Sequence, residues 1–173
     1  MEEKQVMSHL VKGLLISLII IVLSIAGYFS GVAQEKWYNW AVNILLCVAI
    51  IIACVHYANQ KDGFVTFGNV FSHGFKITAI AALIILAYSV LSVGFLFPDI
   101  KEKALERARQ QMEDRGNLTE DQIEKYMDFT KKYFIAFLVF GVMIGTVVIG
   151  VIGSLIGAAV AKKKPVNPLD QMN

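Results

Sequence analysis

Charged residues are almost absent from four long stretches of this 173-residue sequence. The stretches run over about residues 13–33, 37–58, 77–97 and 133–161, and no Asp, Glu, Lys or Arg lies deep in any of them. Each is long enough to cross the hydrocarbon core of a bilayer, which takes roughly 20 residues of helix. Only a helix satisfies its own backbone hydrogen bonds in lipid, so the sequence predicts four transmembrane helices. The lack of intramembrane charge weighs against a proton-coupled transporter or pump.

The sequence also lacks the features of several other protein classes. No motif places a nucleophile beside a general base, so we expect neither an enzyme nor a bound cofactor. The net charge is only +2, with basic and acidic residues interleaved, so no nucleic-acid partner is expected. Cys47 and Cys54 lie about 10 Å apart along a helix axis, too far for a mutual disulfide, and are interpreted as packing residues. His56 and His73 suggest a metal, but no Cys or carboxylate lies at ligand spacing beside them, so none is expected.

The composition is that of a membrane protein. Hydrophobic residues make up 56% of the chain and charged residues 17%, which is outside the usual range of a soluble domain. We expect one all-α integral membrane domain over residues 1–173, embedded in the lipid bilayer. Small residues before Gln34 resemble a signal-peptide cleavage site. The start of the chain is not basic, however, and the apolar run is longer than a usual h-region, so we expect the first span to be retained.

The distribution of positive charge predicts the orientation. An even number of spans puts both termini on one side, and Lys and Arg are nearly balanced between the two sides. The run from Lys162 to Lys164 directly follows the last span without acidic neighbours, whereas the basic residues of the third loop share that loop with acidic ones. We therefore expect both termini in the cytoplasm.

Small residues line one face of the first span and one face of the last. Such stripes let helix backbones approach closely, which is the main way to gain packing when lipid is as apolar as leucine. We favour close packing over hinges or a pore. Because Gly141 and Gly145 form a second small pair, the last helix is expected to contact neighbours on two sides. The predicted packing residues are Gly13, Ser17, Gly27 and Gly31 in the first span and Gly150, Gly153 and Gly157 in the last.

Two asparagines, Asn39 and Asn43, share a face of the second span. An amide in hydrocarbon needs a hydrogen-bonding partner, so we expect this face to point into the bundle toward Ser89 and Ser92 of the third span. The simplest interpretation is an isolated interhelical hydrogen bond. The alternative is a site for a transported substrate or ion.

The loop after the second span, residues 59–76, carries phenylalanines at the period of a helix. Polar residues occupy the positions between them. We expect a short interfacial helix, capped by Thr66, with its rings in the acyl boundary and its cations near the headgroups. The interfacial residues are Phe64, Phe67, Phe71 and Phe75.

Residues 99–132 predict an extramembrane helical hairpin between the third and fourth spans. Asp99 with Glu102, and Thr119 with Gln122, resemble capping boxes at the starts of two helices, and Gly116 is the expected stop between them. We expect the second helix to continue unbroken into the last span. The hairpin is densely charged, so we interpret it as a solvated surface first and a docking surface second.

A family resemblance rests on short motifs along the chain. They are residues 57–63, 66–68, 71 and 74–75 around the second loop, residues 112–113 and 119–123 in the hairpin, and the glycine-rich last span with Lys162 to Lys164. Over essentially the whole chain the sequence is similar to the bacterial membrane-protein family called domain of unknown function 4199. The resemblance implies a four-helix protein of the bacterial inner membrane. It supplies no activity, ligand or catalytic residue.

Two classes of function remain. The first, which we favour, is a noncatalytic structural or interaction protein, either a homo-oligomer or an accessory subunit of another membrane protein. The second is a small transporter or channel, which the face of Asn39 and Asn43 would have to serve. A hydrated cavity that reaches Asn43 would separate the two.

Overall fold

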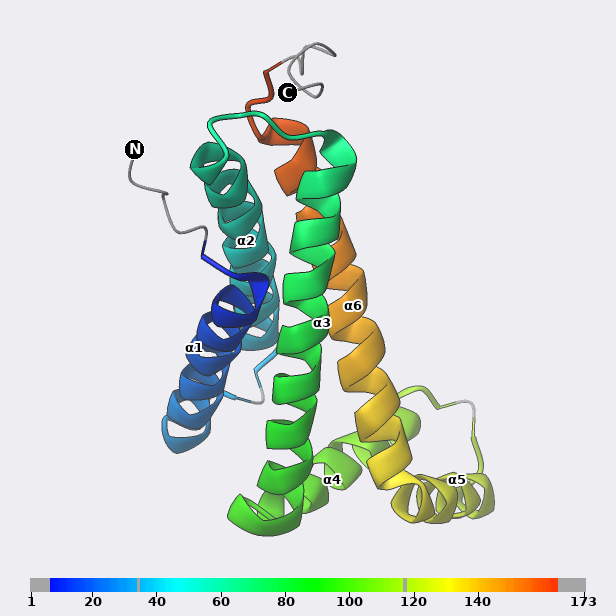
Figure 1. Ribbon diagram of the computed structural model, residues 1–173. Helices are drawn as coiled ribbons and strands as arrows, with labels where there is room; N and C mark the ends of the chain where they lie inside the picture. Colours follow the sequence, from blue (N-terminus) through cyan, green and yellow to red (C-terminus); the bar gives the residue numbers. More distant parts are fainter. Residues whose placement is uncertain (1–6, 34, 117, 165–173) are drawn as a thin grey trace. The chain divides into compact units, whose positions relative to one another are not determined.

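The computed structural model describes residues 7–33, 35–116 and 118–164, and every regular element in them is a helix. Four helices are long and apolar enough to cross a membrane: His9–Phe29, Lys36–Gln60, Phe67–Leu96 and Phe134–Val160. The prediction of an all-α chain with four membrane-spanning helices agrees with this finding. The elements are α1 (His9–Phe29), α2 (Lys36–Gln60), α3 (Phe67–Leu91), the π-helical turn η1 (Ser92–Leu96), α4 (Asp99–Asp114), α5 (Glu120–Lys132) and α6 (Phe134–Val160) (Figure 1).

The chain divides into two compact units, which we describe separately. The first unit holds the residues through Ile85 and those from Gly145 on, and so contains α1, α2, the first part of α3 and the last part of α6. The second unit, Leu86–Ile144, contains the end of α3, η1, α4, α5 and the start of α6. That the whole chain forms one domain stays a prediction.

The core of the first unit consists of small and branched apolar side chains. Ile50 of α2, Ile77 of α3 and Ala158 of α6 are fully buried, and they belong to one cluster with Ile16 and Ile20 of α1. Since lipid is itself apolar, the cluster gains stability mainly from close packing between helices.

Caps and a tight turn set the helix boundaries at one end of the first unit. The Ser8 side chain accepts a hydrogen bond from the Leu10 backbone N–H (3.1 Å) and caps α1. Between α2 and α3, Gly63 has a φ of 83°, a conformation that favours glycine. The Gly63 carbonyl accepts a hydrogen bond from the Lys164 backbone N–H (2.8 Å). The chain that leaves α6 is therefore tied to the α2–α3 loop (Figure 1).

The phenylalanine segment forms part of a transmembrane helix. Phe67 is the first residue of α3, which runs unbroken to Leu91, so the expected separate interfacial helix is absent. Thr66 caps α3 instead, because its Oγ1 accepts a hydrogen bond from the Asn69 backbone N–H (3.2 Å). The ring of Phe71 stacks between those of Phe67 and Phe75, at centroid distances of 6.4 and 6.3 Å. α3 contains no proline, so nothing ends the helical period between this segment and the apolar run that follows.

In the second unit, α4 and α5 contact each other as the two arms of a hairpin. Gly116 lies between them with a φ of 64°, and the Thr119 backbone N–H donates to Oε1 of Gln122 (2.9 Å) at the start of α5. The other predicted capping box is absent, because Asp99 is the first residue of α4 rather than the residue before it. The Asp99 carboxylate pairs with Lys103 (2.8 Å).

The expected continuous helix from the hairpin into the last span is wrong. α5 ends at Lys132, Tyr133 has a φ of −104° and a ψ of 16°, and α6 begins at Phe134. α5 turns away from the start of α6 at this point (Figure 1). The Phe129 ring packs against the rings of both Tyr133 (4.7 Å) and Phe137 (6.0 Å), and these aromatic contacts stabilise the corner.

Candidate functional site

The last part of α6 brings its small residues into the first unit. A Cβ atom added to Gly153 would lie 3.0 Å from a backbone oxygen of α2, and one added to Gly157 would lie 2.6 Å from Cβ of Cys54. At Gly150 an added Cβ would overlap the Thr78 side chain of α3. Any larger side chain would push α6 away from α2 and α3, so these glycines set the distance between the helices.

Most of the predicted small residues of α1 also lie at helix contacts. A Cβ on Gly13 would lie 2.8 Å from an α3 side chain, and one on Gly27 would lie 2.6 Å from the Tyr38 ring of α2. Ser17 is fully buried. Gly31 is different, because it follows the end of α1 with a φ of 76°, and nothing lies within 4 Å of its added Cβ. Gly31 is a turn residue rather than the packing residue that the spacing predicted.

The second small pair of α6 has no neighbour within the units to which its residues belong. Among the described residues, nothing of the second unit lies within 4 Å of a Cβ added to Gly141, and nothing of the first unit lies within 4 Å of one added to Gly145, so neither makes the expected contact inside its unit. In its most apolar stretch only 11% of α6 is buried, against 22 to 33% for the other three spans. α6 therefore presents the most open apolar surface of the four.

The expected inward position of the asparagines is wrong. Asn39 and Asn43 are both exposed, and the Asn39 amide nitrogen donates to the backbone oxygens of Ala33 (3.2 Å) and Glu35 (3.1 Å) close to it in sequence. Asn43 does share a helical face with Ile50, which is fully buried. The first ten residues of α2 are almost all exposed. The face that Asn43 shares with Ile50 is therefore buried at Ile50 but no longer covered at Asn43.

The serines and cysteines of the spans occupy different environments. In the second unit, Ser89 is half-buried, and Ser92 begins η1 with a buried hydroxyl that has no hydrogen-bond partner among the described residues. In the first unit, Cys54 is fully buried, with its Sγ 3.8 Å from the Val70 carbonyl oxygen. Cys47 is half-buried, and both cysteines are free.

A buried lysine is the polar feature of the first unit that the sequence analysis missed. Lys12 lies inside α1 and is only 4% exposed. Its Nζ donates to the Ala53 carbonyl (3.2 Å) and to Oε1 of Gln60 (3.5 Å), and it lies 3.3 Å from Nε2 of His73. No carboxylate of the described residues forms an ion pair with it. A charged side chain at the bilayer centre costs roughly 2.5–3.5 kcal/mol to insert, and Lys12, in the first turn of α1, lies near the end of its span.

Aromatic rings surround the same lysine. The His73 ring stacks on the Tyr57 ring at a centroid distance of 4.0 Å and an interplanar angle of 12°. The His9 ring meets His73 edge-on at 6.1 Å, and Lys12 Nζ lies 5.9 Å from the centroid of Tyr57. Because an ammonium only donates, His73 accepts at Nε2, which leaves Nδ1 to carry the proton of the neutral ring.

A sequence signal for this cluster exists in the spacing of α1. Lys12 precedes the buried residues Ile16 and Ile20 at intervals of four, so it continues their inward face. The span predicted from the sequence began at residue 13, so Lys12 lay just outside it. His56, which was considered together with His73, is exposed on α2. Within the described ranges, no three His, Cys, Asp or Glu side chains gather as a metal site would require.

Four membrane-length helices, all of which meet through glycines in the first unit, define a multi-pass α-helical membrane protein. Residues 12–163 match the family described as protein of unknown function, DUF4199. The match covers most of the chain, so the protein belongs to this family, and the resemblance seen in the sequence is confirmed. Comparison with curated proteins and with solved structures gives no match.

Proposed function

We propose that this protein is a noncatalytic structural component of a bacterial inner membrane, and that it works by associating with a second copy of itself through α6. The observation that supports this proposal is the open pair Gly141 and Gly145 on the least buried span. Small residues four apart let two helix backbones approach closely in lipid. The other small face of α6 is already occupied by α2 and α3.

The geometry of the open face favours a second copy as the partner. Val148 and Ile152 continue the line of Gly141 and Gly145 at intervals of three and four, and both are exposed. Two copies related by a two-fold axis would bring this line against itself, because such an interface is made from the same surface on both subunits. Gly141 and Gly145 of one copy would then contact the same residues of the other, and Val148 and Ile152 would extend the contact.

The alternative of a small transporter or channel has less support. It depends on an inward polar face at Asn39 and Asn43, and both side chains are exposed. We therefore keep the association role as the proposed function.

The proposed association predicts a change in mass. Gly145→Leu is expected to convert a dimer to a monomer, because the leucine would hold the two backbones apart. Light scattering after size-exclusion chromatography in detergent, with the detergent mass subtracted, measures the state of the protein. Ile144→Leu, a change at an exposed neighbour, should leave the mass unchanged. A parent that is monomeric at every protein concentration and in bilayer discs would refute the proposal.

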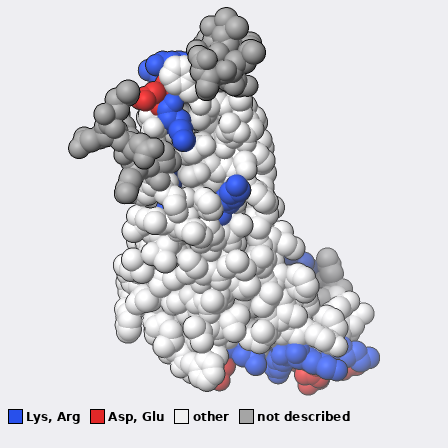
Figure 2. Space-filling model, in the orientation of Figure 1, with Lys and Arg blue, Asp and Glu red and all other residues white. Residues whose placement is uncertain are grey.

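The proposed orientation places the termini in the cytoplasm. Lys163 and Lys164 lie over the rings of Phe67 (5.6 Å) and Phe64 (5.2 Å), so the basic run after α6 covers the start of α3. On the visible face of the first unit, Lys and Arg gather toward the end that carries the α2–α3 loop (Figure 2). Cations at a membrane surface favour the cytoplasmic side with its anionic lipids. The rings of Phe64, Phe67, Phe71 and Phe75 would then lie at that interface.

A further inference from the structure

A polar pocket of about 290 Å³ lies in the first unit beside the buried lysine. It is formed by the start of α1, the end of α2 and the start of α3. Its volume far exceeds that of one water molecule, roughly 30 Å³, so it has room for a group of several heavy atoms. The lining side chains include His9, Tyr57, Asn69, Ser72, His73 and Lys76.

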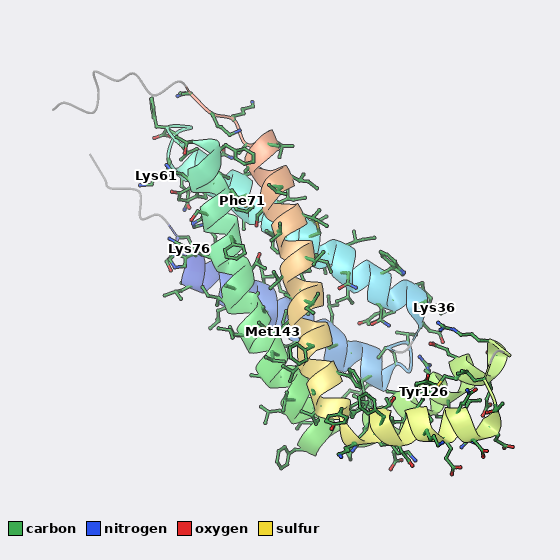
Figure 3. The ribbon with its side chains drawn as sticks, turned by 90° about the vertical axis from the view of Figure 1, so that its right-hand side faces the viewer. Lys36, Lys61, Phe71, Lys76, Tyr126 and Met143 are labelled. Atoms are coloured by element: carbon green, nitrogen blue, oxygen red, sulfur yellow. The ribbon has the colours of Figure 1, made fainter. Side chains whose placement is uncertain are left out.

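The chemistry of the lining selects an anion. Lys76 is a cation, His9 and His73 carry ring N–H groups, and Asn69 and Ser72 supply an amide and a hydroxyl donor. None of the described lining residues is acidic. Figure 3 shows Lys76 at the start of α3, on the same end of the first unit as Lys61.

The backbone contributes in the same direction. Ser8, the residue that caps α1, also lines the pocket, so the amino end of α1 lies at its edge. The first N–H groups of a helix and its dipole both favour negative charge at this end. This effect adds to the side-chain donors and does not depend on them.

Lys12 lies directly behind the pocket wall. Its Nζ is 3.3 Å from Nε2 of His73, a lining residue, and its other two partners are neutral acceptors. The charge of Lys12 is therefore solvated by neutral groups, with no carboxylate of the described residues paired to it. An anion held against His73 would sit one ring away from this ammonium and would offset its buried charge.

We propose that this pocket binds a phosphate group, carried either by an anionic phospholipid headgroup or by a small soluble phosphorylated compound. Lys76 and His9 contact the phosphate oxygens, and Nδ1–H of His73 donates to one of them. Lys12 donates to Nε2 of the same ring and so fixes its orientation. Phosphate oxygens are strong acceptors that match such a set of donors. The inference goes beyond the association role and does not require a second copy of the chain.

Whether the bound phosphate belongs to a lipid headgroup is tested with the purified full-length protein. Native mass spectrometry measures the lipid that the protein retains from vesicles of phosphatidic acid, phosphatidylglycerol or phosphatidylcholine. We expect preferential retention of the two anionic lipids, and a loss of on the order of tenfold in Lys76→Gln, the factor expected when a charge-assisted hydrogen bond to the phosphate is removed. Lys61→Gln, which removes an exposed lysine outside the pocket, should bind like the parent. His73→Gln is expected to reduce binding further, and Lys76→Gln carries the test if that variant fails to fold.

Whether the pocket binds a soluble phosphate compound is tested by titrating inorganic phosphate and glycerol 3-phosphate into the detergent-solubilised protein and following its melting temperature. Stabilisation by either compound that Lys76→Gln abolishes and Lys61→Gln retains assigns the site to soluble phosphate compounds. Selective retention of anionic lipid without that stabilisation assigns it to headgroups. If neither probe binds better than phosphatidylcholine or sodium chloride, or if Lys76→Gln and Lys61→Gln weaken binding equally, the pocket is no phosphate site and the proposal falls.

Discussion

Replacing Gly150 with leucine is expected to lower the melting temperature of the solubilised protein by on the order of 10 °C. Even a single methyl group at this position would overlap the Thr78 side chain of α3, and a leucine would force α6 out of its contact with α2 and α3. Overfilled contacts of this kind typically cost about 1–3 kcal/mol, and more when the helices must separate. The melt can be followed by circular dichroism in detergent.

A matched control lies on α3. Gly68→Leu introduces the same side chain at an exposed position, where the nearest atom to an added Cβ is Oγ1 of Thr66 at 3.9 Å, so it should melt like the parent. A double variant tests the same contact. Gly150→Ala alone is expected to lower the melting temperature, and adding Thr78→Ala, which shortens the side chain that the new methyl group would overlap, should recover part of the loss. If Gly150→Leu melts with the parent, α6 does not pack on α3 through this face.

Replacing Lys12 with aspartate is expected to cost at least about 3 kcal/mol of stability. The side chain of aspartate is two bonds shorter than that of lysine, so its carboxylate would be buried without reaching the groups that surround the ammonium. The two oxygens among them, the Ala53 carbonyl and Oε1 of Gln60, could not donate to it in any case. An uncompensated buried charge and a small cavity would both destabilise the fold.

The same charge reversal at an exposed site separates burial from net charge. Lys61→Asp is expected to change the stability by less than about 0.5 kcal/mol, because Lys61 is exposed in the α2–α3 loop. Thermal melts of the two variants, in a buffer without phosphate, make the comparison. Equal stability of Lys12→Asp and Lys61→Asp would mean that Lys12 faces water rather than the protein interior.

Much of the fold follows from the sequence because it depends on local physics. The length of an apolar run is a direct measure of its ability to span lipid, and the first, second and fourth spans appear close to their predicted positions. The third begins at Phe67, well before its predicted start at residue 77. The small residues of α6 could be assigned to a common face because the helical period is fixed at 100° per residue. Gly116 ends α4 with a positive φ, as its position after the charged helix indicated.

The predictions from the sequence fail where one residue pattern is compatible with two environments. The phenylalanines at residues 67–75 follow the same period whether they lie along the interface or on the surface of a longer span, and Thr66 decides the matter by starting α3 at Phe67. At Asn43 the period correctly indicates the face shared with Ile50. It does not reveal how far along the helix that face stays covered, which depends on the neighbouring helices.

The candidate phosphate site was hidden for a related reason. It combines single residues from three helices, and no two of its ring-bearing members, His9, Tyr57 and His73, belong to one short motif. Lys12 lay just outside the predicted first span, and charged residues are rare inside spans. Only the folded chain shows that this lysine is buried and that its partners are carbonyl, amide and imidazole groups.

The proposed arrangement of four spans with both termini in the cytoplasm is tested most directly by reporter fusions in a bacterial host. Alkaline phosphatase, which becomes active only outside the cytoplasm, is inserted in one fusion at Asn117, between α4 and α5, and joined in another to Asn173. We expect an active enzyme at Asn117 and an inactive enzyme at Asn173, since the last span separates the two positions. Activity at Asn173 with none at Asn117 would invert the orientation, and equal activity at both would mean that α6 does not cross the membrane.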